Sequence, residues 1–200
     1  MPFIGLTGGL GTGKTTVLGH FKSLGAYTID ADKLVHELLK KPSTIKELSG
    51  VLGKGILSKR NSKISIDKKR MADLIFSDAL KRRSAEKVIH PHIIKSAKDI
   101  KERISAKTPD AVIVFEVPLL FEGGYEKIFD KIIVVYCSKA KAINRAVKKG
   151  LSKEQALRRI HAQMPVSKKK KAADYSINNS STFDALRPQV KAVYKELIKG

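Results

Sequence analysis

The glycine-rich stretch at residues 5–16 (GLTGGLGTGKTT) contains the residue types that bind phosphate: Gly8 is followed by four residues and then by Gly13-Lys14-Thr15. Glycines let the backbone turn its N–H groups toward one point, where they hold the oxygens of the α- and β-phosphates. A lysine at this spacing reaches the β- and γ-phosphates, and the next hydroxyl is a ligand of Mg²⁺. The spacing therefore predicts a loop that binds a nucleoside triphosphate. Its residues are Gly8, Gly9, Gly11, Thr12, Gly13, Lys14, Thr15 and Thr16.

Two carboxylates, Asp30 and Asp32, follow the apolar run at 26–30. In an open parallel sheet, ligands bind at the carboxyl ends of the strands, so we expect this turn to face the phosphate loop. A carboxylate there can orient an acceptor hydroxyl and take its proton during in-line transfer. We expect Asp32 in this role; Asp30 is the alternative, or caps the following helix. His36, one helical turn after Asp32, is a further candidate, although a lone histidine is usually structural.

Glu116 lies near the end of the apolar run at 111–117, where an acidic group holds magnesium in nucleotide-binding folds, usually through water. We expect Thr15 and Glu116 to hold Mg²⁺, with a carboxylate that only ends a strand as the alternative. The residues that follow combine a proline and large apolar side chains with a carboxylate, which suits the wall of an acceptor pocket and ordinary packing equally. They are Pro118, Leu119, Leu120, Phe121 and Glu122.

Basic residues gather between 139 and 171. A mobile lid that carries arginines can close on the transferring phosphoryl group, neutralise its charge and exclude water. Arg145 and Arg159 are the candidates for this role, whereas we expect the lysines at 168–171 to form a solvated face. The Asn-Lys-x-Asp sequence by which GTPases read guanine is missing from the chain, which argues against a switch protein.

The composition excludes several classes of protein. A single cysteine, Cys137, excludes an intramolecular disulfide and a cysteine metal cluster, and we expect it to be a buried small hydrophobe. The chain has no secretory leader and no apolar stretch near the ~20 residues of a membrane span, so we expect a cytoplasmic protein. Forty basic residues against nineteen acidic ones leave a net charge of +21, which attracts anions without choosing among them.

Apolar periodicity predicts alternating strands and helices, and therefore a three-layer α/β domain. The predicted strands are 3–7, 26–30, 111–117 and 131–137. Helical patterns follow the phosphate loop and recur at about 32–40, 67–76, 78–105, 139–149, 152–163 and 183–198. Ser152 with Gln155 three residues later predicts a capping box. The stretch 53–65 is expected to be a flexible loop.

Several ordered motifs together resemble the dephospho-coenzyme A kinase family. Beyond the phosphate loop they are IDADKLVHELL (29–39), VIHPHI (88–93), VPLLFEGGYEKIFDKIIVVY (117–136), RRIHAQMP (158–165) and AADYSINNSS (172–181). The resemblance implies transfer of the ATP γ-phosphate, with Mg²⁺, to the ribose 3′-hydroxyl of dephospho-coenzyme A, the last step of coenzyme A synthesis. It also implies one P-loop kinase domain over 1–200, with a five-stranded parallel sheet, an acceptor-binding helical region at about 32–105 and a lid at about 139–168.

The resemblance also implies roles for individual residues. Asp32 would activate the acceptor hydroxyl, and His90 would belong with Pro118 to Glu122 to the acceptor site. Arg145 would be a lid arginine. The remaining implied residues are Arg159 and Gln163 on the helix after the lid, and Asn179 near the adenine.

Two positions depart from the family's pattern. Lys149 stands where a second lid arginine is common, and lysine lacks the planar fork that grips two oxygens. Ser181 replaces a usual glycine beside the base, which leaves the choice of ATP or GTP open.

The alternative functions are a P-loop kinase of another nucleotide or nucleoside, and nucleic-acid binding. Few aromatic residues and no base-stacking motif argue against the second. We expect ATP and dephospho-coenzyme A as the partners, no membrane, no specific nucleic acid, and a monomer or weak homo-oligomer.

Overall fold

The computed structural model describes residues 1–60 and 63–199. The chain forms two compact units: the first joins Met1–Asp30 to the part of the chain after Ile100, and the second is Ala31–Ile100. Within the described residues, no helix is long and apolar enough to cross a membrane.

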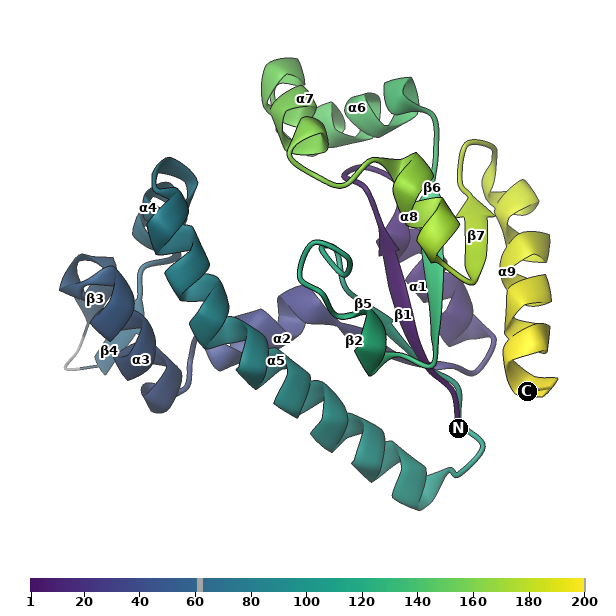
Figure 1. Ribbon diagram of the computed structural model, residues 1–200, viewed down its shortest axis with the longest axis horizontal. Coiled ribbons are helices and arrows are strands. Elements are labelled where there is room, and N and C mark those ends of the chain that lie inside the picture. Colours follow the sequence, from purple (N-terminus) through teal and green to yellow (C-terminus); the bar gives the residue numbers. More distant parts are fainter. Residues whose placement is uncertain (61–62, 200) are drawn as a thin grey trace. The chain divides into compact units, whose positions relative to one another are not determined.

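A five-stranded sheet with all neighbouring strands parallel forms the centre of the first unit, in the order β2-β5-β1-β6-β7 (Figure 1). Its strands are β1 (Phe3–Gly8), β2 (Tyr27–Asp30), β5 (Ile113–Glu116), β6 (Lys131–Tyr136) and β7 (Tyr175–Asn178). Every residue of β1 and β5 is buried, as expected for parallel strands covered on both faces. The predicted five-stranded parallel fold is confirmed. The strand order reverses at β1, so a ligand is expected at the carboxyl end of this strand.

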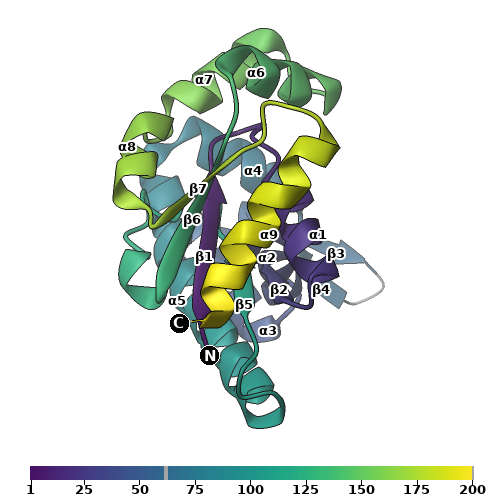
Figure 2. The ribbon, with the colours of Figure 1, turned by 90° about the vertical axis from the view of Figure 1, so that its right-hand side faces the viewer.

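Helices cover the sheet from both sides. Helices α1 (Lys14–Ser23) and α9 (Phe183–Lys199) run side by side along one face (Figure 2). Their apolar residues, among them Phe21 and Val190, pack with the inward strand residues Ile4 and Leu6. Phe3 points to the opposite face, because side chains alternate along a strand, and its ring centroid lies 5.1 Å from that of Phe129. The other helices of this unit are α6 (Lys139–Lys148), α7 (Lys153–His161) and α8 (Val166–Ala172).

The second unit is mainly helical and has a core of its own. It contains α2 (Ala31–Leu38), α3 (Pro42–Leu52), α4 (Lys68–Ser77) and the hairpin β3 (Leu57–Arg60) and β4 (Lys63–Ile66). It also holds most of α5 (Ala79–Lys107), whose last turns belong to the first unit. Leu48, Leu52, Ile56, Ile66 and Met71 form the centre of its core.

Three elements were not predicted from the sequence, and one prediction was wrong. Strand β7 buries only Ile177, so it has no apolar run, and α8 consists mostly of four consecutive lysines. Helix α3 lies in a stretch for which no helix was expected. The predicted flexible loop at 53–65 instead contains a 3₁₀ turn (Lys54–Ile56) and the strands β3 and β4, while its residues 61–62 lie outside the described residues. The capping box is confirmed, since Ser152 and Gln155 exchange side-chain-to-backbone hydrogen bonds.

Candidate active site

The phosphate loop connects the carboxyl end of β1 to the first turn of α1. Gly11 and Gly13 adopt φ angles of +71° and +85°, which glycine tolerates best. A Cβ at Gly13 would also clash with the side-chain amide of Asn179. Because Gly13 is the N-cap of α1 and has no polar side chain, the first amides of the helix are left to a ligand. The loop thus has the backbone of an anion site at a helix N-terminus.

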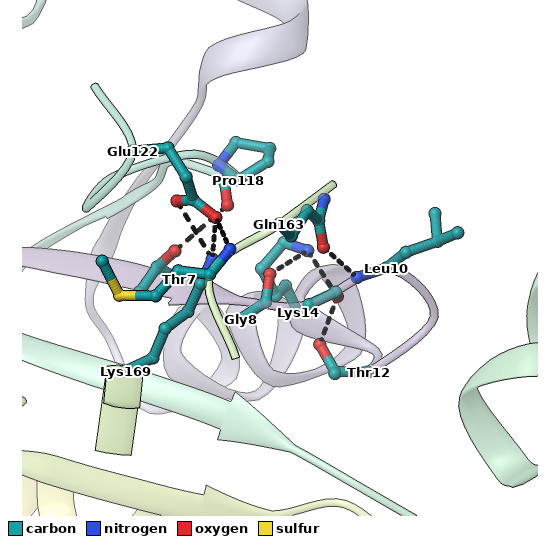
Figure 3. A network of polar contacts seen from close by, with 11 residues as sticks. Thr7, Gly8, Leu10, Thr12, Lys14, Pro118, Glu122, Gln163 and Lys169 are labelled. Carbon is teal, nitrogen blue, oxygen red and sulfur yellow. Dashed lines mark hydrogen bonds and ion pairs between the residues drawn. The ribbon is translucent and has the colours of Figure 1, made fainter. Parts of the chain in front are cut away.

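Lys14 lies against the loop that precedes it. Its Nζ donates to the backbone carbonyls of Gly8 (3.1 Å) and Gly9 (3.2 Å), as Figure 3 shows. The hydroxyl of Thr12 donates to the same Gly9 carbonyl at 2.9 Å. These contacts fix the ammonium group beside the loop, where it adds a full positive charge to the ring of amides.

Thr15 and Glu116 lie next to each other, as expected for a pair that holds a metal. The Thr15 hydroxyl is 3.4 Å from Glu116 Oε1, although the two residues are far apart in the sequence. Strand β5 brings Glu116 to the carboxyl edge of the sheet, in register with Leu6 of β1 and with Asp30 of β2. A hydroxyl and a carboxylate are hard oxygen ligands, which Mg²⁺ prefers over nitrogen or sulfur.

The described residues contain no group of three or more histidine, cysteine or acidic side chains that could hold a metal.

Arg145 and Asn179 brace the second half of the loop. The Asn179 side-chain amide donates to the Thr12 carbonyl at 2.8 Å, and only 6% of Asn179 is exposed. The guanidinium of Arg145, on α6, donates to the Thr12 carbonyl through Nη1 and to the Asn179 carbonyl through Nη2, each at 3.2 Å. Helix α6 and the end of β7 therefore approach the same part of the loop.

Cys137 is half-buried rather than fully buried as predicted. Its thiol lies 3.8 Å from the Gly11 carbonyl. Burial raises the pKa of the thiol, and the nearby Arg145 guanidinium opposes this shift without cancelling it. The thiol is therefore protonated at neutral pH, which makes it a poor nucleophile.

The segment 118–122 joins β5 to the phosphate loop and to α8. Thr7 donates to the Pro118 carbonyl at 3.3 Å, and Leu120 and Phe121 are buried, whereas Leu119 is exposed. Glu122 Oε1 lies 2.8 Å from Nζ of Lys169, whose side chain is 0% exposed.

The expectation of a solvated face at 168–171 is therefore wrong for Lys169. Its neighbour Lys170 places its ammonium 4.0 Å from the centroid of the Tyr136 ring, whereas Lys168 and Lys171 are exposed. An α-helix points successive side chains in different directions, so the four lysines have different environments. Because the four residues are identical, the sequence does not show which of them is buried.

Arg159 lies exposed on α7, and Gln163 follows at the end of that helix. The Gln163 side chain accepts a hydrogen bond from the backbone N–H of Leu10 at 2.9 Å. This residue of the lid region thereby contacts the phosphate loop directly.

Asp32, His36 and His90 belong to the second unit. Asp32 and His36 are exposed on α2, and Nδ1 of His36 lies 2.6 Å from Nζ of Lys68. Burial lowers the pKa of His90, and the nearby Glu86 opposes that shift. His90 is thus mainly neutral at pH 7, when it can accept as well as donate a hydrogen bond.

Comparisons with known proteins point to the same family as the sequence motifs. The family model described as "Dephospho-CoA kinase" matches residues 2–185. The chain is 41% identical over 200 residues to the dephospho-CoA kinase of Aquifex aeolicus, covering 100% of this chain and 99% of the relative. It is 34% identical to that of Chlorobaculum tepidum, covering 98% and 94% of the two chains.

The chain belongs to the dephospho-CoA kinase family. The recognition made from the motifs is thereby confirmed, as are the kinase class and the last step of coenzyme A synthesis. Enzymes of the dephospho-CoA kinase family take their phosphate from ATP.

Solved structures agree with the family. A dephospho-CoA kinase from Campylobacter jejuni has a TM-score of 0.70 at 29% identity, covering 99% of this chain and 98% of the other. A Thermus thermophilus protein has a TM-score of 0.81 at 29% identity, covering 98% and 97%. A shikimate kinase from Bacteroides thetaiotaomicron, at 14% identity and a TM-score of 0.51, covers 98% of each chain and shares the fold alone.

Two contacts of this dephospho-CoA kinase family member were not expected from its sequence. Lys169 carries no local signal that separates it from the exposed lysines around it. Gln163 was expected near the lid, but its contact with Leu10 joins residues 153 positions apart. Both contacts depend on tertiary packing, which brings α8 and the segment between α7 and α8 close to residues far away in the sequence.

Proposed function

We propose that this protein transfers the γ-phosphate of ATP to the ribose 3′-hydroxyl of dephospho-coenzyme A, which yields ADP and coenzyme A. Family membership over residues 2–185 supports the reaction. The observation that carries the site is the phosphate loop itself, with Lys14 fixed against two loop carbonyls and Thr15 beside Glu116. Phosphoryl transfer needs positioning and charge neutralisation more than covalent chemistry, and these groups supply both.

On the donor side, the residues Gly11 to Thr16 hold the triphosphate and Lys14 neutralises charge on its β- and γ-phosphates. Arg145 and Arg159 add positive charge from the lid at about 139–168, whose closure excludes water from the donor. Asn179, whose side-chain amide donates to the Thr12 carbonyl of the loop, lies next to the adenine. The contacts of Arg145 with the loop carbonyls support this assignment.

Mg²⁺ completes the donor site, held by the Thr15 hydroxyl and the Glu116 carboxylate together with water and phosphate oxygens. If bound there, the ion would supply positive charge that offsets the charge developing on the phosphate oxygens. The short approach of Thr15 to Glu116 and their oxygen chemistry support this pair as ligands.

On the acceptor side, Asp32 orients the 3′-hydroxyl and takes its proton. The hydroxyl oxygen then forms a bond to the γ-phosphorus, the bond from that phosphorus to the bridging oxygen breaks, and ADP leaves with the electron pair. His36, His90 and Pro118 to Glu122 bind the acceptor, and the helical region at about 32–105 provides most of its surface. The exposure of Asp32 and His36 on one helix supports a role at a surface open to substrate.

The whole chain, 1–200, acts as one catalytic domain, as a monomer or weak homo-oligomer. The alternative is a kinase that uses the same donor site with another nucleotide or nucleoside as acceptor. Acceptor choice separates the two functions.

A coupled assay of ADP release over a panel of acceptors tests the proposal. The panel contains dephospho-coenzyme A, adenosine, AMP and shikimate. We expect dephospho-coenzyme A to give turnover far above hydrolysis by water, and Lys14→Ala to lower that rate by at least about 10²-fold. Lys22→Ala, a change on the exposed side of α1, serves as the matched control. No turnover with dephospho-coenzyme A would refute the proposed acceptor.

A further inference from the structure

One peptide group of the phosphate loop, the bond between Gly9 and Leu10, is held from both of its sides. The Gly9 carbonyl accepts from Lys14 Nζ at 3.2 Å and from the Thr12 hydroxyl at 2.9 Å. The Leu10 N–H points the other way and donates to Gln163 Oε1 at 2.9 Å (Figure 3). This peptide therefore connects Lys14 to a side chain from the end of α7.

The two directions are coupled because a peptide group is planar and trans. Whatever fixes the direction of the Leu10 N–H also fixes the direction of the Gly9 carbonyl. Rotation of this plane is easy next to glycine, which has no Cβ to restrict it, and Gly9 provides that freedom on one side. An acceptor for the Leu10 N–H therefore helps to keep the Gly9 carbonyl on Lys14, together with the Thr12 hydroxyl on the carbonyl side.

Gln163 is itself held in place by its neighbour in the chain. The backbone N–H of Met164 donates to Glu122 Oε1 at 2.8 Å. Glu122 is in turn fixed by Lys169, whose Nζ lies 2.8 Å from Oε1 and 3.1 Å from Oε2. The Lys169 side chain is 0% exposed and that of Glu122 is 21% exposed, so the pair has little water to exchange with. Because the buried Lys169 ammonium contacts both carboxylate oxygens, it restricts the direction in which the Glu122 carboxylate can point.

We propose that Gln163 is a positioning residue that orients Lys14 through the Gly9–Leu10 peptide. The Glu122–Lys169 pair keeps Gln163 in position through its neighbour Met164. The lysine of the phosphate loop thereby depends on the segment that ends the lid. Without Gln163, the Gly9 carbonyl keeps only its contacts with Thr12 and Lys14, and its direction relative to Lys14 is less firmly fixed. The inference rests on the proposed function, because it assigns Lys14 to the transferring phosphate.

Gln163→Leu tests the proposal, since it keeps the bulk of the side chain and removes the acceptor. A misplacement of about 1 Å at a catalytic group can lower the rate about 10²-fold, so we expect kcat to fall about 10- to 100-fold. Gln163→Asn, which stays polar but is too short to reach Leu10, should give a similar loss. Gln163→Glu keeps an acceptor oxygen, so kcat should return to near the wild-type value, with any repulsion of the triphosphate seen in KM for ATP.

Amide hydrogen exchange of Leu10, followed by NMR, gives a readout that needs no acceptor substrate. We expect Leu10 to exchange faster in Gln163→Leu and Gln163→Asn than in the wild type and Gln163→Glu, at unchanged thermal stability. Lys153→Leu, a change at an exposed position in the first turn of α7, is the control for both measurements and should leave them unchanged.

Wild-type kcat in Gln163→Leu, or unchanged Leu10 exchange in both Gln163→Leu and Gln163→Asn, would overturn the inference. A wild-type protein that ignores dephospho-coenzyme A would instead refute the proposed function, and the Leu10 measurement would still decide whether Gln163 holds the loop.

Discussion

Proton removal from the acceptor is assigned to one exposed carboxylate, while a second lies two residues before it. Asp32 begins the second unit in the first turn of α2, whereas Asp30 ends β2, in register with Glu116. Asp30 is thus tied to the edge of the sheet that holds the predicted magnesium ligands. The two carboxylates are neighbours in the sequence but belong to different structural units, which favours different roles for them.

Asp32→Asn should separate these roles. The amide is nearly isosteric with the carboxylate but cannot take a proton, and general-base catalysis contributes about 10²- to 10⁴-fold. We expect kcat to fall by about that factor while the Kd for ATP, measured by calorimetry, changes little. Asp30→Asn is the paired variant, and we expect it to retain a much larger part of kcat. Normal kcat in Asp32→Asn with loss in Asp30→Asn would move the base role to Asp30.

At the scale of elements, α8 is joined to the segment after β5 by an ion pair between the buried Lys169 and the partly exposed Glu122. Lys169 and Glu122 lie 47 positions apart in the sequence. Burying the Lys169 ammonium is unfavourable unless its charge is compensated, and Glu122 provides the counter-ion. Glu122 also holds Met164, which makes it the common anchor of the chain between α7 and α8.

Lys169→Met should destabilise the protein strongly, because it leaves the Glu122 carboxylate without its counter-ion. Breaking a fully buried pair costs about 3–5 kcal/mol, and because water reaches Glu122 we expect a smaller loss of about 2 kcal/mol, which lowers Tm by roughly 5 °C in a protein of this size. Adding Glu122→Gln should recover most of the loss, since an amide oxygen still accepts from Met164 and no buried charge remains. Thermal unfolding of both variants beside Lys171→Met, an exposed neighbour, measures the effect. A double variant no more stable than Lys169→Met would show that the pair is not the cause.

At the scale of the whole molecule, the fold does not explain the large positive net charge. The net charge of +21 is spread over many exposed lysines, on α9 as well as near the site. A large net charge attracts anionic substrates over long distances, but it also destabilises the folded state through self-repulsion. Dissolved salt screens both effects, with a Debye length of about 10 Å at 0.1 M.

Salt should therefore stabilise this protein. We expect Tm to rise as NaCl increases from about 0.02 to 0.3 M, because screening relieves repulsion between like charges. A variant with Lys191→Gln and Lys195→Gln, two exposed positions on α9, should show a smaller rise. Scanning calorimetry without nucleotide makes the comparison, and a Tm that falls throughout this range would contradict it.

Local patterns were sufficient for much of the fold and for the backbone shape of the phosphate loop, whereas the binding roles of its residues remain predictions. The phosphate loop was predictable because left-handed turns at Gly11 and Gly13 need glycine, and because the amides, lysine and hydroxyl that bind phosphate lie within a few residues. Strands β1, β2, β5 and β6 were predicted from mainly apolar runs. The capping box was predicted from Ser152 and Gln155, which lie three residues apart. The acceptor-side roles of Asp32, His36 and His90 remain predictions.

The sequence by itself determined the family, the parallel sheet and the residues able to grip a triphosphate, since these follow from spacing within single segments. Only the tertiary structure decided that one lysine of a run of four is buried, that a short polar segment becomes strand β7, and that Gln163 reaches Leu10. In each of these cases the partner lies in a distant part of the chain, so the residue's environment is created by packing and leaves no trace in its local sequence.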